Sequence, residues 1–133
     1  MSEITLSATD ENLDAVIDFL SGELEALDCP MRTITQVAVA AEEIYVNVAH
    51  YAYAPNVGDV TVRFDGQPGE ARITFVDSGV PYDPLAKPDP DVTLTAEERG
   101  IGGLGIFMVK KSMDEVFYSG ADGKNAFTMV KRF

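Results

Sequence analysis

Residues 33–53 read TITQVAVAAEEIYVNVAHYAY, and this stretch decides the fold. Its apolar side chains recur at helical spacing, which predicts one long helix with a buried face. Pro30 suits the start of such a helix, and the helix should end before Pro55. The predicted apolar stripe consists of Val37, Ala41, Ile44, Val48 and Tyr51.

The segments on either side of this helix alternate between strand and helix patterns. Ile4 and Leu6 alternate with polar residues, as in a short strand. A helix with its own apolar stripe then runs to about residue 27, where the stripe holds Leu13, Val16, Ile17, Leu20, Leu24 and Leu27. Beyond residue 55 we expect strands at 60–64 and 71–77, a helix at 106–113, and strands at 116–118 and 127–130. This order favours an α+β two-layer sandwich, in which helices cover one face of a mixed, mostly antiparallel sheet.

Composition limits the classes of function. A length of 133 residues with 46% hydrophobic content fits one domain over 1–133. The net charge of -12 argues against a nucleic-acid partner, because DNA and RNA binding needs a basic face. No apolar run is long enough to span a membrane and no signal segment begins the chain, so we expect a cytoplasmic location. Cys29 is the single cysteine, and we expect it in the core or at its boundary.

A line of polar residues runs beside the stripe of the long helix. Glu43, Asn47 and His50 are spaced i, i+4 and i+7 and should therefore share one face. The amide oxygen of Asn47 suits a hard cation such as Mg²⁺, and Glu43 could accept a proton from an attacking hydroxyl. The alternative is a solvated helix face, with His50 bonded to a backbone carbonyl.

An Asp-x-Gly sequence ends the strand predicted at 71–77. The carboxylate of Asp77 can accept the amino hydrogen of adenine, while Gly79 lets the backbone pass close to a flat base. The alternative is an ordinary turn.

A glycine run precedes the last predicted helix. It contains Gly100, Gly102, Gly103 and Gly105, and it could present backbone N–H groups to phosphates, with Arg99 beside them. No strand precedes the run and only 28 residues follow Gly105, so a dinucleotide-binding βαβ unit does not fit. The Walker pattern is absent. A hinge or close helix packing is the structural alternative.

The order of these motifs resembles the GHKL, or histidine-kinase-like, ATPases. EEIYVNVAHYAY, FVDSGVPYDP and RGIGGLGIFMVKKSMDEVFY look like the anti-sigma-factor serine kinases of that superfamily. The resemblance implies that ATP and Mg²⁺ are the cofactors. Asn47 would coordinate Mg²⁺, Asp77 and Gly79 would hold adenine, and Glu43 would be the general base. The four glycines would wrap the phosphates, and a loop at about 80–99 would form a lid.

The resemblance also implies partners. These kinases phosphorylate a serine on a small anti-sigma-factor antagonist, sequester a sigma factor and form homodimers. The first helix carries no Lys or Arg, so a partner docking there would meet an acidic face. The alternative function is a non-catalytic, nucleotide-binding regulatory module. A detached histidine-kinase domain or a structural protein with a chance glycine loop fits less well.

Overall fold

A computed structural model describes residues 1–86 and 104–133 of the chain. Five strands form one sheet: β1 (Ser2–Ser7), β2 (Asp59–Gln67), β3 (Glu70–Asp77), β4 (Glu115–Ser119) and β5 (Asn125–Arg132). Three α-helices accompany them: α1 (Leu13–Ala26), α2 (Met31–Asn47) and α4 (Leu104–Ser112). Shorter helical turns are η1 (Asp10–Asn12), η2 (Val48–Ala52) and η3 (Ala121–Gly123).

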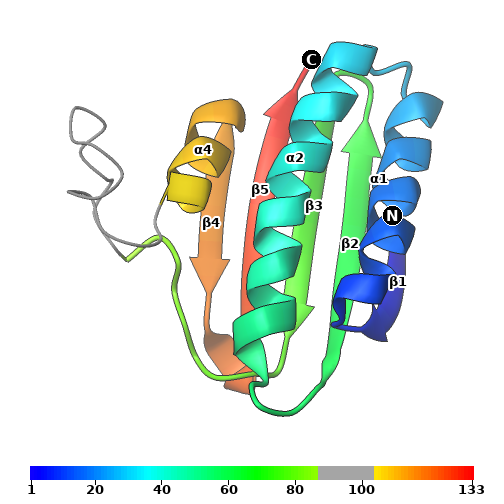
Figure 1. Cartoon of the computed structure of the whole chain (residues 1–133). Coiled ribbons are helices and arrows are strands. Elements are labelled where there is room, and N and C mark those ends of the chain that lie inside the picture. The colour runs from blue at the N-terminus through cyan, green and yellow to red at the C-terminus, as the bar shows by residue number, and fades with distance from the viewer. Residues whose placement is uncertain (87–103) are drawn as a thin grey trace.

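The strand order across the sheet is β1-β2-β3-β5-β4. The helices lie on one face of this sheet, with α2 between α1 and α4 (Figure 1). This arrangement confirms the α+β sandwich. Every pairing among the described strands is antiparallel, so the parallel component allowed for in a mixed sheet is not found there.

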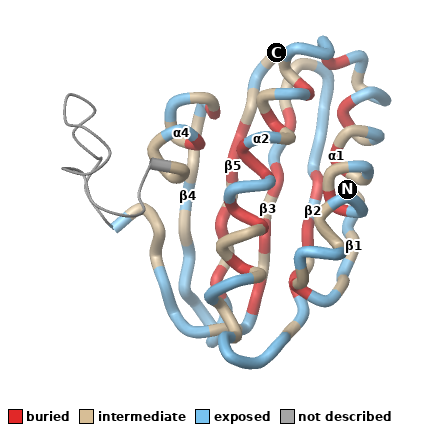
Figure 2. The backbone as a smooth tube through the Cα atoms, viewed as in Figure 1, coloured by how far each residue is buried: buried red, intermediate tan, exposed pale blue. Residues whose placement is uncertain are grey.

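The core lies between the sheet and the helices (Figure 2). In α1, Val16, Leu20 and Leu24 are buried as predicted from their spacing. On the sheet, alternate residues of β2 and β3 face the helices, as the period of two requires. Cys29 is also buried, and this burial raises the pKa of its thiol.

The end of the long helix departs from the predicted pattern. Val37, Ala41, Ile44 and Val48 are buried, but Tyr51 is 70% exposed. The reason is η2, a π-helical segment that continues α2 directly. A π-turn takes more residues than an α-turn, so residues after position 47 rotate away from the face that α-helical spacing assigns them.

Tyr45, a fully buried residue of α2, connects this helix to the start of the chain. Its hydroxyl donates to the carbonyl of Thr9 at 2.6 Å and accepts the Thr9 N–H at 3.1 Å. Burial raises the pKa of this hydroxyl, and the Thr9 hydrogen bond opposes that rise.

We expect Tyr45→Phe to lower the free energy of unfolding by about 1–3 kcal/mol, because Thr9 would lose two part-buried hydrogen bonds to the Tyr45 hydroxyl and keep only its backbone bonds to Ser7 and Asn12. Denaturant unfolding would measure the change. Tyr51→Phe is the matched control, since that exposed hydroxyl should contribute within about 0.5 kcal/mol. Equal stability of the two variants would contradict this role for Tyr45.

Among the described residues, no helix combines the length and the apolar character needed to cross a lipid bilayer.

Candidate functional site

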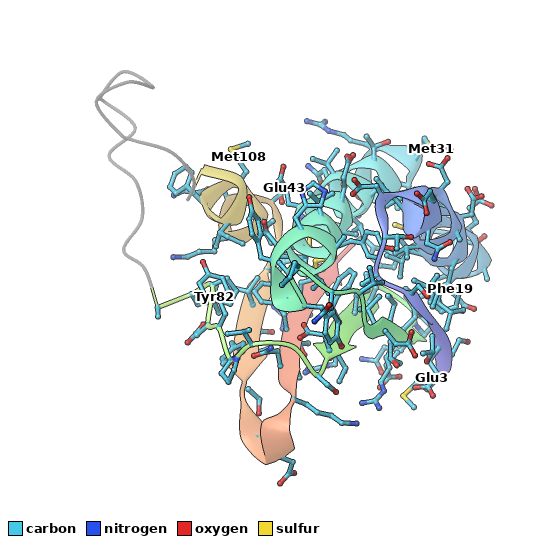
Figure 3. All side chains as sticks on the ribbon, turned by 60° about the horizontal axis from the view of Figure 1, so that its bottom comes forward. Glu3, Phe19, Met31, Glu43, Tyr82 and Met108 are labelled. Atoms are coloured by element: carbon cyan, nitrogen blue, oxygen red, sulfur yellow. The ribbon has the colours of Figure 1, made fainter. Side chains whose placement is uncertain are left out.

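Two helices and the end of a strand supply the described candidate residues. Glu43 is exposed on α2, and Figure 3 shows it on the side nearest α4, where Met108 is labelled. Gly105, in the first turn of α4, lies directly against its carboxylate, because a Cβ at Gly105 would overlap Glu43 Oε2. Gly105 therefore allows this carboxylate to approach the positive end of the α4 dipole.

Asn47 is the last residue of α2, one helical turn beyond Glu43, and it is half-buried. Within residues 1–86 and 104–133, neither side chain forms a hydrogen bond. An amide and a carboxylate therefore stand next to each other with open polar atoms, as the i, i+4 spacing predicted.

His50 does not continue this line, contrary to the prediction from its i+7 spacing. Its Nε2 lies 2.8 Å from the carboxylate of Asp10, at the start of η1. The π-helical geometry of η2 accounts for the change of direction. The alternative bond to a backbone carbonyl is also not found, since the partner is a side chain.

Asp77 ends β3 and is 6% exposed. Its Oδ1 accepts hydrogen bonds from the Gly79 N–H and from Asn125 Nδ2, both at 2.9 Å. Oδ2 has no donor among the described residues. A carboxylate accepts at both oxygens, so Oδ2 of Asp77 is available to a further hydrogen-bond donor.

The structure also requires a residue without a side chain at Gly79. A Cβ there would overlap the carbonyl oxygen of Ala52 in η2, and the next residue, Val80, donates its N–H to the same oxygen at 2.8 Å. The turn after Asp77 is thereby held against the end of the α2–η2 helix. This contact joins the Asp77 end of the site to the helix that carries Glu43 and Asn47.

Tyr53 holds the same turn from another side. Its hydroxyl accepts the Ser78 N–H at 2.8 Å and donates to the carbonyl of Asp59 at 2.6 Å. Neither Tyr53 nor Asn125 was among the predicted site residues. The alternation of β5 could have revealed Asn125, because Asn125, Phe127 and Met129 fall on the buried face and a polar residue is unusual there.

The remaining candidates lie outside the described residues: Arg99, Gly100, Gly102, Gly103 and most of the expected lid at about 80–99. Within the described ranges, no three His, Cys, Asp or Glu side chains gather closely enough to hold a metal ion.

The chain is similar in sequence to proteins named serine-protein kinases. The chain is 28% identical to a serine-protein kinase RsbW from Bacillus cereus over 87 residues, and 26% identical to one from Bacillus anthracis over the same length. Each match covers 62% of this chain and 54% of the relative. The chain therefore spans about half the length of these curated relatives.

Solved structures share the fold. A Mycobacterium tuberculosis structure of RsbU and RsbW domains superposes with a TM-score of 0.64 at 18% identity, covering 99% of this chain and 32% of that one. The histidine kinase domain of a blue-light activated histidine kinase from Erythrobacter litoralis gives 0.57 at 17% identity, covering 94% of this chain and 64% of that one. The model of the histidine kinase-like ATPase domain matches residues 6–131. The chain belongs to the histidine kinase-like ATPase family.

Proposed function

We propose that this chain is a Mg-ATP-dependent protein-serine kinase that acts in the bacterial cytoplasm on a small anti-sigma-factor antagonist. Membership of the ATPase family supports nucleotide binding, and the relatives named serine-protein kinases support the reaction class. The observation that carries the proposal is a line of polar groups beside the α2–η2 helix. Glu43 and Asn47 lie on this helix, Gly105 of α4 contacts Glu43 at one end, and the turn after Asp77 contacts Ala52 at the other.

The dimensions of this line suit a nucleotide. The helix rises about 6 Å from residue 43 to residue 47, at about 1.5 Å per residue, and η2 continues it for five more residues to Ala52. One end offers a buried carboxylate with a free oxygen, and the other offers a helix N-terminus beside an exposed carboxylate. An adenine amino group fits the first, and phosphates fit the second.

Each residue then has a defined part. Asp77 Oδ2 would accept from the adenine amino group, and the amide oxygen of Asn47 would hold Mg²⁺, a hard cation that prefers oxygen ligands and would neutralise phosphate charge. ATP supplies the transferable phosphoryl group when bound. Glu43 would accept the proton of the acceptor serine, whose oxygen would form the new bond to phosphorus as the diphosphate leaves.

Arg99, Gly100, Gly102 and Gly103 complete the proposal as phosphate-binding residues, together with Gly105, and the loop at about 80–99 acts as a lid. A homodimer and a bound sigma factor are further parts of the proposal. The exposed side of α1 is acidic at Asp14, Asp18 and Glu25, so a partner that docks there must be basic.

The deciding experiment uses the purified chain with Mg-ATP. We expect calorimetry to record binding of one ATP per chain, and γ-labelled ATP to transfer label to a serine of an antagonist domain encoded beside it. A Ser→Ala acceptor is the control. Absence of binding would overturn the proposal, whereas binding without transfer to any candidate would favour the non-catalytic regulatory module.

A further inference from the structure

Asn125 is a buried polar residue to which the proposed reaction assigns no part. It begins β5, is 8% exposed and lies directly opposite Asp77 in the antiparallel register of β3 and β5. Burying an amide that has no hydrogen-bond partners costs free energy, so the partners of Asn125 indicate its role.

All of these bonds connect parts of the proposed base-binding end. Asn125 Nδ2 donates to Asp77 Oδ1 at 2.9 Å and to the Val80 carbonyl at 3.0 Å. Its Oδ1 accepts the Tyr118 hydroxyl at 2.5 Å and the Tyr82 N–H at 3.2 Å. One side chain thus joins β3, β4, β5 and the segment that follows the Asp77 turn.

The chemistry of the partners permits only one orientation of this amide. The Val80 carbonyl can only accept, and the backbone N–H of Tyr82 can only donate, so the NH₂ and the oxygen cannot exchange places. The Asn125 NH₂ must therefore point at Asp77 Oδ1.

We propose that Asn125 is a positioning residue that determines base specificity by fixing the rotation of the Asp77 carboxylate. Two donors, the Asn125 NH₂ and the Gly79 N–H, hold Oδ1, so Oδ2 alone faces the ligand. The Tyr118 hydroxyl holds the amide in turn. This inference rests on the proposed nucleotide-binding function of the same site.

Pre-organisation explains why such a network should affect selectivity. A carboxylate free to rotate must be ordered when the base binds, and water can compete for both of its oxygens. A carboxylate already held by two donors presents one acceptor at a fixed place, which suits a ligand that donates there and disfavours one that accepts. The effect should therefore appear in the ratio of ATP to GTP affinity.

The test measures ATP and GTP dissociation constants and thermal unfolding for variants in the full chain. We expect Asn125→Ala to weaken ATP binding about tenfold, the change for one lost charge-assisted hydrogen bond, with a smaller loss for GTP. Tyr118→Phe removes one hydroxyl and should lower the ATP-to-GTP preference about two- to fivefold. Thr128→Val is the matched control, because it breaks a β5 hydrogen bond to Thr74 at 2.9 Å that does not touch Asp77.

The outcomes distinguish failure of the Asn125 inference from failure of the proposed nucleotide binding. A lower ATP-to-GTP preference in Asn125→Ala and Tyr118→Phe, but not in Thr128→Val, supports the inference even where all three melt at lower temperature. An unchanged preference in Tyr118→Phe and in folded Asn125→Ala would overturn it, since Asn125 would then serve stability alone. If the unaltered chain binds neither nucleotide, the proposed function itself fails.

Discussion

Glu43→Gln is expected to reduce phosphoryl transfer about 10²–10⁴-fold while leaving ATP bound, because glutamine fills the same space against Gly105 but cannot accept a proton. The carboxylate also stands beside the end of α4 where phosphates are proposed to bind. Removing its charge should leave ATP affinity unchanged or slightly tighter. Single-turnover transfer and calorimetry on the same preparation would separate the two effects.

Glu42→Gln provides the matched control. It removes one negative charge from the adjacent, exposed position of α2, about 100° around the helix, and should transfer phosphate at the normal rate. If both variants lost transfer equally, the local charge and not a base would be responsible. If Glu43→Gln lost ATP binding in proportion to transfer, Glu43 would be a binding residue.

The layers of the fold could be predicted because they depend on periodicity. The stripes of α1 and α2 and the alternation of β2 and β3 are local patterns, and the structure confirms them. The spacing of apolar residues does not predict a change of helix type, and no sequence pattern in residues 48–52 indicates a π-turn. Tyr51 and His50 were therefore assigned to the wrong faces.

The geometry of the candidate site was predictable only where its residues lie close together in the sequence. Glu43 and Asn47 stand one turn apart, and Asp77 and Gly79 share a turn, so local rules place each pair. Asn125 is 48 residues from Asp77, and their contact depends on β3 pairing with β5 and not with its sequence neighbour β4. The pairing of β3 with β5 depends on how all five strands pack in one sheet, which no local sequence pattern predicts.

Asp77→Asn is expected to do more than weaken ATP binding: it should move preference toward GTP. The Oδ1 position must accept from Asn125 Nδ2 and from the Gly79 N–H, so the new carbonyl oxygen should occupy it. The new NH₂ then takes the place of Oδ2 and faces the base. A donor there opposes the amino group of adenine and matches the carbonyl of guanine.

The expected loss for ATP is about 10- to 100-fold, since one charged hydrogen bond worth about 1.5–3 kcal/mol is replaced by two opposed donors. Competition between labelled ATP and GTP would measure the preference directly. Asp114→Asn is the control, because Asp114 Oδ2 accepts the Arg132 N–H at 2.5 Å at the end of β5 opposite to Asn125. ATP and GTP weakened equally by Asp77→Asn would remove Asp77 from the base contact, because a general loosening of the turn cannot distinguish a donor from an acceptor.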